Sequence, residues 1–311
     1  MELRHLRYFV AVAEEGSITR AAERLGIQQP PLGQQIKALE DELGVELFDR
    51  QPKRISLNSA GEVFLEDARD ILKRASEAID HIRRFDRGES GRLSIGFTSS
   101  ASLHVLAPKL LQVFREAYPL VKIAVEESET YELILGLQQR RIDVALLHIA
   151  VDRFPDLTGT ILSEEDMLVA VPRTHPLAAW PLEPVTLQML ADQDLVVYRR
   201  PDGPGIFEKI FNIFTAAGIT PNISDEVYRL IAALNLVAAG RGLTLVPASM
   251  QVLHRESVIY RPLAPGALPL LPLYLAYPHK TRLALVRNFI SIAAALGDTH
   301  AGFAVTKSAG S

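Results

Sequence analysis

Hydrophobic positions in the first 57 residues recur every three or four residues and predict three short helices. The third helix begins near Pro30 and carries a core stripe of Leu32, Ile36, Leu39 and Leu43. The first helix would supply another wall of this core through Leu3, Leu6, Phe9, Val10 and Ala13. Three helices of this length around one core predict a small, separately folded head.

The second and third helices are joined by a tight turn. Ser17 is a suitable N-cap for the second helix, and Gly26 can adopt the left-handed conformation that ends it. This pattern is typical of a DNA-binding helix-turn-helix, in which the second of the two joined helices enters the major groove. We call the third helix of the chain the recognition helix. Its face opposite the core stripe carries Gln29, Pro30, Gly33, Gln34 and Lys37.

Three cations follow in the segment 48–57, at Arg50, Lys53 and Arg54. This segment would form a two-stranded wing whose cations reach phosphates and the adjacent minor groove. The alternative is three solvated surface cations. Net charge does not support DNA binding, because residues 1–58 hold 8 Lys and Arg against 9 Asp and Glu. We place four of the nine acidic residues in a cluster after the recognition helix: Glu40, Asp41, Glu42 and Glu46.

The pattern from residue 59 onward predicts one long amphipathic helix. Ser59 and Glu62 have the spacing of a capping box at its start. Its apolar stripe comprises Phe64, Ala68, Ile71, Leu72, Ala75, Ile79, Ile82 and Phe85. The stripe could pack on its own domain, but a long helix between two domains favours pairing with a second copy of the chain. Residues 86–91 contain two glycines and would break the helix into a hinge.

From residue 92 the pattern changes to strands that alternate with helices, which predicts parallel α/β sheets. The predicted strands are 93–97, 121–125, 142–147, 167–171, 195–198, 223–227, 243–246 and 270–277. The last strand and a helix over 282–296 would return the chain to the first set, giving two lobes. The end from residue 298 is small and polar, and we expect it to fray.

Composition limits the chemistry of the chain. Its 311 residues predict two or more domains, and its lack of cysteine excludes disulfides, thiolate metal sites and cysteine nucleophiles. The sequence has no Gly-x-Ser-x-Gly motif, no phosphate-binding glycine loop and no histidine pair at helical spacing. We assign the acidic run from Glu164 to Asp166 to loop surface. We therefore expect neither an enzyme nor a bound metal or cofactor.

No apolar run approaches the length of a membrane span, and charged residues interrupt the first twenty positions. We expect a cytoplasmic protein without a membrane partner.

Five short motifs together resemble the LysR-type transcriptional regulators. They are Glu2-Leu-Arg-His-Leu-Arg-Tyr-Phe-Val10, Arg20-Ala-Ala-Glu-Arg-Leu25, Gln29-Pro-Pro-Leu32, Leu39-Glu-Asp-Glu-Leu-Gly44 and Leu47-Phe-Asp-Arg50. The likeness extends more weakly to about residue 297, and the Gln-Pro-Pro motif is most similar to the branch that controls aromatic-compound catabolism.

The resemblance implies an α+β multidomain fold. A winged helix-turn-helix DNA-binding domain would occupy 1–58, and a linker and dimerisation helix with its hinge 59–90. A two-lobed α/β inducer domain similar to periplasmic binding proteins would occupy 91–311. Its parts would be lobe one at about 91–162 plus 268–297, lobe two at about 163–267, and a tail at 298–311.

The inducer would bind in the cleft between the lobes. Thr98, Ser99 and Ser100 follow a strand and precede a helix, where hydroxyls and free N–H groups can receive a carboxylate. Ordinary N-capping is the alternative. The resemblance to the aromatic-catabolism branch assigns inducer carboxylate binding to Ser99 and Thr130.

Four further residues complete the predicted cleft. His148 stands where relatives often carry Arg, and a neutral imidazole offers no permanent charge to the second carboxylate of a dicarboxylate inducer. A structural role for this lone histidine is the alternative. Tyr198, Phe207 and Pro247 could form an apolar wall, although core packing would also account for them.

The resemblance thus implies a regulator that senses an aromatic or carboxylate metabolite and controls promoter activity. Its partners would be double-stranded promoter DNA, the inducer, RNA polymerase and further copies of itself in a homodimer or homotetramer. One alternative is a two-lobed solute-binding protein with a helical N-terminal extension, which the helix-turn-helix and the lack of an export signal disfavour. An enzyme on the same lobes would need a reactive cluster that the sequence lacks.

Overall fold

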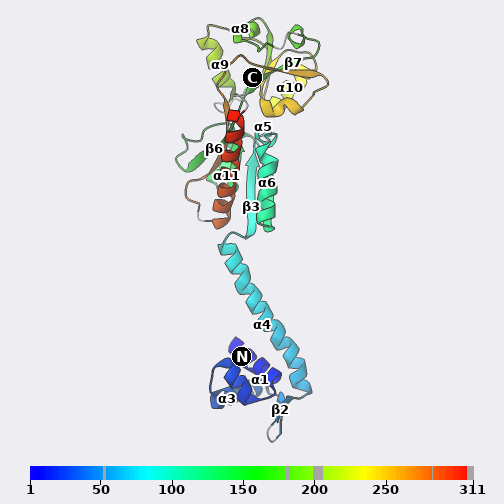
Figure 1. Cartoon of the computed structure of the whole chain (residues 1–311), viewed down its shortest axis with the longest axis vertical. Helices are drawn as coiled ribbons and strands as arrows, with labels where there is room; N and C mark the ends of the chain where they lie inside the picture. The colour runs from blue at the N-terminus through cyan, green and yellow to red at the C-terminus, as the bar shows by residue number, and fades with distance from the viewer. Residues whose placement is uncertain (52–53, 180–182, 199–205, 282, 307–311) are drawn as a thin grey trace. The chain divides into compact units, whose positions relative to one another are not determined.

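The computed structural model of the protein describes residues 1–51, 54–179, 183–198, 206–281 and 283–306 (Figure 1). The chain divides into two compact units, Met1–Arg84 and Phe85–Ser311. Among the described residues, no helix is both long enough and apolar enough to cross a membrane.

The first unit is the predicted winged helix-turn-helix with the start of a long helix. Its elements are α1 (Leu3–Glu15), α2 (Ile18–Leu25), α3 (Gln29–Leu43), β1 (Phe48–Gln51), β2 (Arg54–Leu57) and α4 (Ser59–Asp86). The Ser17 hydroxyl accepts a hydrogen bond from the Arg20 amide at 3.4 Å, and Gly26 ends α2 with φ of 66°, as predicted. Ser17 and Gly26 are therefore the N-cap and C-cap of α2.

The core of this unit is centred on Phe9, whose ring lies 5.3 Å from that of Phe48 and 5.0 Å from that of Phe64. Leu32, Ile36 and Leu39 are buried as predicted. Leu3 and Leu43 were predicted to belong to this core but are 43% and 37% exposed. They occupy the first turn of α1 and the last turn of α3, where the helices extend past the core.

Helix α4 begins with a different cap from the predicted one. The side-chain oxygen of Asn58 accepts a hydrogen bond from the Gly61 amide at 2.9 Å, so Asn58 is the cap and Ser59 is the first helical residue. Phe64, Ala68 and Leu72 pack against the helix-turn-helix core. Further along the stripe, Ile79 and Ile82 are 46% and 62% exposed, so this part of the helix has no cover within the described chain.

The second unit contains a five-stranded sheet with the order β4-β3-β5-β12-β6. Its strands are β3 (Ser90–Phe97), β4 (Leu120–Glu127), β5 (Val144–Leu147), β6 (Leu157–Glu165) and β12 (Leu271–Pro278). The first three are parallel, but β12 is antiparallel to both of its neighbours. The predicted parallel pairing therefore holds for β3, β4 and β5 but not for β12, because the chain comes back from the second lobe in the opposite direction.

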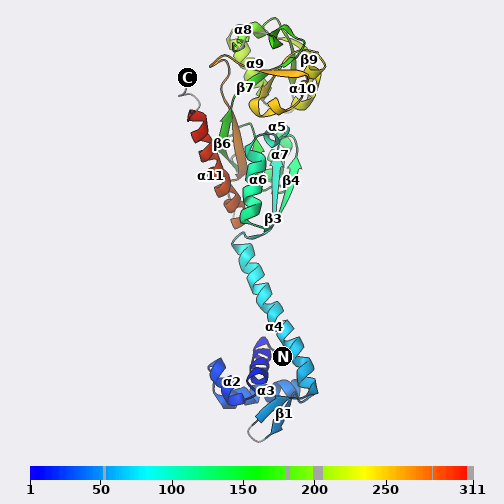
Figure 2. The ribbon, with the colours of Figure 1, turned by 45° about the vertical axis from the view of Figure 1, so that its right-hand side comes forward.

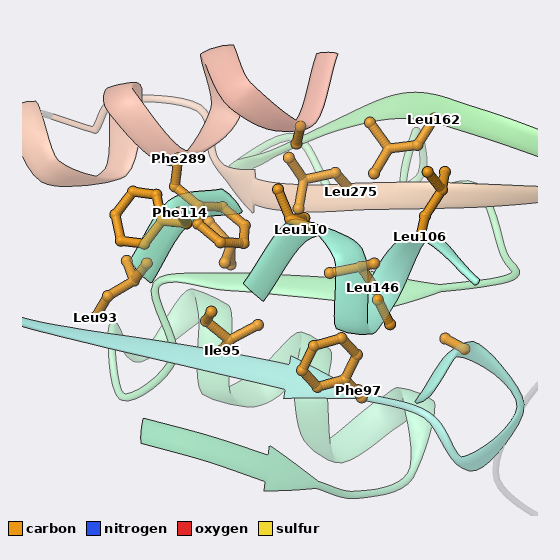
Figure 3. Packing of buried hydrophobic residues seen from close by; sticks show 14 of the residues in the cluster. Leu93, Ile95, Phe97, Leu106, Leu110, Phe114, Leu146, Leu162, Leu275 and Phe289 are labelled. Carbon is orange, nitrogen blue, oxygen red and sulfur yellow. The ribbon is translucent and has the colours of Figure 1, made fainter. Parts of the chain in front are cut away.

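Helices cover both faces of this sheet (Figure 2). On one face lie α6 (Leu106–Ala117) and α11 (Ala284–Thr306), and Phe114 meets Phe289 edge to face at 5.1 Å between ring centroids (Figure 3). On the other face lies α7 (Thr130–Gln138), which buries Leu133 and Leu137. The helix α11 continues to Thr306, so the chain remains helical well beyond the expected fraying point at residue 298.

The second lobe is built on the antiparallel sheet β10-β7-β11 and the parallel pair β8-β9. Its strands are β7 (Met167–Pro172), β8 (Asp194–Tyr198), β9 (Asn222–Val227), β10 (Thr244–Pro247) and β11 (Val258–Pro262). Its helices and turns are α8 (Leu187–Leu190), α9 (Ile206–Ala216), α10 (Leu230–Ala238), η1 (Pro176–Ala178) and η2 (Ala248–Val252). The hydrophobic pattern did not predict β6, in which polar and apolar residues are mixed, or the short strand β11. The chain crosses between the lobes after β6 and before β12, as the two-lobe interpretation requires.

Candidate functional site

In the described part of the chain, the outward face of α3 is largely exposed. Gln29, Pro30, Gln34 and Lys37 are exposed and Gly33 is partly exposed. A Cβ added at Gly33 would meet no described atom within 4 Å, so packing within the head does not require glycine there. The Thr19 hydroxyl lies 3.2 Å from the Gln29 side-chain oxygen, to which it can donate a hydrogen bond. This face therefore presents two amide side chains, a cation and a glycine that packing within the head does not explain.

The predicted wing is an antiparallel hairpin in which Arg50 pairs with Ile55 and Gln51 with Arg54. Lys53 lies outside the described residues, as do the side chains of Arg50 and Arg54. The backbone places both arginine positions on the hairpin beside the helix-turn-helix, which is the placement that the sequence predicted.

In the second unit, the parallel strands bring the candidate inducer residues to one sheet edge. The Thr98 amide donates to the Leu146 carbonyl at 3.2 Å, and the Ser128 amide to the Phe97 carbonyl at 3.1 Å. The chain segments that leave β3, β4 and β5 therefore start side by side. They lead to α5 (Ser99–Ser102), to Thr130 at the start of α7 and to His148.

The four hydroxyl residues at this edge have different roles. Thr98 is a buried N-cap whose hydroxyl oxygen lies 3.4 Å from the Ala101 amide, and Ser100 is buried as well. Ser99 and Thr130 are partly exposed. The Ser99 hydroxyl donates to the Glu127 carboxylate at 2.6 Å, so its hydrogen is directed toward a negatively charged acceptor at the rim. Of the four, Ser99 and Thr130 are the two that a ligand can reach.

His148 is 3% exposed, and its Nδ1 lies 3.1 Å from the Pro272 carbonyl oxygen. A carbonyl only accepts hydrogen bonds, so Nδ1 carries the proton and Nε2 of the neutral ring is an acceptor. Burial lowers the pKa of His148 to about 4, which keeps the ring neutral. Nε2 lies 3.7 Å from a Glu165 carboxyl oxygen and has no hydrogen-bond partner among the described residues.

Glu165 was predicted to lie on loop surface, which is wrong. It ends β6, and its side chain is only 9% exposed. Its carboxyl oxygens accept hydrogen bonds from the Ser249 amide at 2.7 Å and the Ser249 hydroxyl at 3.2 Å. Burial raises the pKa of Glu165. Ser249 belongs to the second lobe, so this pair joins the lobes where the chain crosses between them. The one sequence feature that could have indicated the burial of Glu165 is its position near the predicted boundary between the lobes.

The described residues of the predicted apolar wall do not form one surface in the structure. Tyr198 lines a small, mainly apolar pocket of the second lobe together with Phe211, Phe214 and Thr244. Burial raises the pKa of its hydroxyl. Pro247 is buried at the end of β10, where it pairs with Met167, so packing accounts for it. The side chain of Phe207, on α9, lies outside the description.

Two contacts close the lobes over the sheet edge. The Arg229 guanidinium, just before α10, lies 3.6 Å from the Glu129 carboxylate, just before α7. Leu103, just after α5, packs against the apolar cluster of the second lobe that includes Leu234. Residues of α5 and α7 therefore meet the second lobe directly, and a ligand bound at this edge would contact both lobes.

Two protein families match the chain. The LysR substrate binding domain matches residues 86–297, and the bacterial regulatory helix-turn-helix protein of the lysR family matches residues 3–62. The uncharacterized HTH-type transcriptional regulator YnfL of Escherichia coli (strain K12) is 37% identical over 291 residues, covering 93% of this chain and 96% of its own.

Two solved structures are also similar. Full-length CbnR in complex with its target DNA has a TM-score of 0.82 at 30% identity, covering 96% of this chain and 100% of its own. The BenM effector binding domain with its effector benzoate has a TM-score of 0.60 at 29% identity, covering 68% of this chain and 93% of its own.

Proposed function

Because the chain belongs to the LysR family of bacterial transcriptional regulators, we propose that it senses one small metabolite and adjusts promoter activity in response. The observation that carries this proposal is the meeting of Ser99, Thr130 and His148 at one sheet edge, where both lobes contact the surrounding helices. Residues 1–58 would read DNA, 59–90 would pair two copies, and 91–311 would bind the inducer.

The chemistry of the edge favours an aromatic monocarboxylate as inducer. Ser99 and Thr130 would each donate a hydrogen bond to its carboxylate, with Ser99 released from Glu127. His148 carries no charge for a second carboxylate. The binding of benzoate by the related BenM domain supports an aromatic acid.

Binding of the inducer would favour one arrangement of the two lobes, since a ligand shifts a conformational equilibrium by its difference in affinity for the two states. Through dimers or tetramers, this shift would alter how the paired heads sit on the promoter and how they recruit RNA polymerase. The protein would act in the cytoplasm and without catalysis.

The test is calorimetric titration of the full chain with benzoate, its hydroxylated derivatives and a matched dicarboxylate. We expect binding of a monocarboxylate, and a loss of roughly 1.5–3 kcal/mol of binding free energy for Ser99→Ala and for Thr130→Val. Both variants should bind DNA like the parent when no inducer is present.

Thr158→Val is the matched control, because Thr158 lies near the start of β6, at the opposite edge of the same sheet. Parent-like titrations of both test variants would place the inducer elsewhere.

A further inference from the structure

We propose that Glu40 is a positioning residue for DNA reading, which fixes the wing against the recognition helix α3. Glu40 lies in the last turn of α3 and is 5% exposed, although we had placed it in an acidic cluster after that helix. One oxygen of its carboxylate accepts hydrogen bonds from the backbone amides of Leu47 and Phe48, at 2.9 and 3.3 Å. Leu47 precedes β1 and Phe48 is its first residue, so these hydrogen bonds connect the start of the wing to α3.

The same short loop is held from its other side by the start of α4. The Leu47 carbonyl accepts a hydrogen bond from the Asn58 amide at 3.1 Å, and the Asn58 side-chain amide donates to the Glu46 carbonyl at 2.8 Å. The backbone of α4 approaches so closely that a Cβ at Gly61 would lie 2.1 Å from the Leu47 carbonyl oxygen. Glu40 and Asn58 therefore hold Leu47 and Phe48 in place from two sides.

The physical role of Glu40 is to accept hydrogen bonds from two buried backbone amides. A buried amide without an acceptor is costly, and a hydrogen bond to a charged acceptor is stronger than one between neutral groups. Without the carboxylate, the loop would have to move to find other partners for both amides. Since β1 begins at Phe48, such a movement would redirect β1 and β2 relative to α3.

This inference rests on the proposed DNA reading by α3 and the wing. If the wing contacts phosphates, a wing that no longer points at the duplex loses those contacts and the counterion release that accompanies them. The expected signature is a lower dependence of binding on salt, with the folded head retained. A general loss of folding would instead abolish binding at all salt concentrations.

The experiment measures binding of the full chain to a duplex that the parent protein selects from a randomised library, by fluorescence anisotropy over a range of salt concentrations. Glu40→Met keeps the length and helix propensity of the side chain but removes the acceptor. We expect at least tenfold weaker binding and a salt slope lower by about one to two units. Asp41→Met is the matched control, because Asp41 is the exposed neighbour on the same helix and its loss changes the charge equally. It should bind within threefold of the parent.

Glu40→Gln retains the shape and one acceptor oxygen, and it decides the matter if the methionine variant does not fold. We expect faster hydrogen exchange at the Leu47 and Phe48 amides and a smaller reduction of the salt slope. Parent-like exchange and salt slope in Glu40→Gln, or equal losses in Glu40→Met and Asp41→Met, would overturn the inference. If the parent protein selects no duplex at all, the proposed DNA reading is wrong. The exchange rates of the Leu47 and Phe48 amides still test whether Glu40 holds the start of the wing.

Discussion

The imidazole of His148 is buried as a neutral group, and this has a measurable consequence at the scale of one residue. Its pKa in the folded protein is about 4, against an ordinary value of 6.5. The unfolded chain therefore takes up this proton at a higher pH than the folded one. The associated stability is fully present above pH 6.5 and is lost as pH falls toward 4.

We predict that acid destabilises the inducer domain of the parent more than that of His148→Gln. Between pH 6.5 and 4 the difference should reach about 3 kcal/mol, at 1.36 kcal/mol for each unit of pKa shift. Calorimetric melting at several pH values measures it. Glu165 has a raised pKa, so its effect has the opposite sign and lowers stability as pH rises above 4.5, but it is present in both proteins. Parallel stability curves would show that the histidine is not buried as neutral imidazole.

A second prediction at this scale concerns Gln34, which is exposed on the outward face of α3. A glutamine amide can pair with N6 and N7 of adenine, whereas arginine pairs with O6 and N7 of guanine. Gln34→Arg should move the preference toward guanine at one symmetric pair of operator positions, by roughly 1–3 kcal/mol. Selection from a randomised duplex library tests this. An unchanged selected sequence would mean that this side chain does not reach a base edge.

At the scale of elements, α4 has two different halves. Its first turns complete the core of the head through Phe64 and Ala68, while Ile79 and Ile82 remain exposed. An apolar stripe that its own chain leaves exposed is the surface that a second copy of the helix would cover.

We therefore predict that Ile71→Asp combined with Ile79→Asp gives monomers and abolishes operator binding. Burying an unpaired carboxylate costs several kcal/mol, and a single head makes half of the contacts of a pair. Analytical ultracentrifugation measures the change, with Lys73→Asp on the exposed polar face as the control for added negative charge. A double variant that sediments as a dimer would assign assembly to the inducer domain.

At the scale of the whole molecule, the chain combines a head whose parts are local in sequence with a domain whose parts are not. The core of the head is formed by residues between Leu6 and Leu72. The inducer domain pairs β12 with β5, about 130 residues earlier in the chain, so its sheet is completed only near the end of the chain. The lobe crossing at Glu165 and Ser249 joins positions 84 residues apart.

Features that depend on local periodicity and capping could be predicted from the sequence alone. Ser17, Gly26 and the stripe Leu32, Ile36 and Leu39 were sufficient to predict the helix-turn-helix, because a cap or an amphipathic face is a property of a few neighbouring residues. The same reasoning located most strands, and the strand ends brought Ser99, Thr130 and His148 together.

Which polar groups are buried depends on contacts between segments that are distant in the sequence. Glu40 and Glu165 look like surface acids in the sequence, since each has acidic neighbours. Their burial depends on amides supplied by distant segments, Leu47 and Phe48 for one and Ser249 for the other. The tautomer of His148 likewise depends on a carbonyl 124 residues away, at Pro272. A carboxylate or an imidazole is stable inside a protein only with such partners, and no local pattern records which segment will provide them.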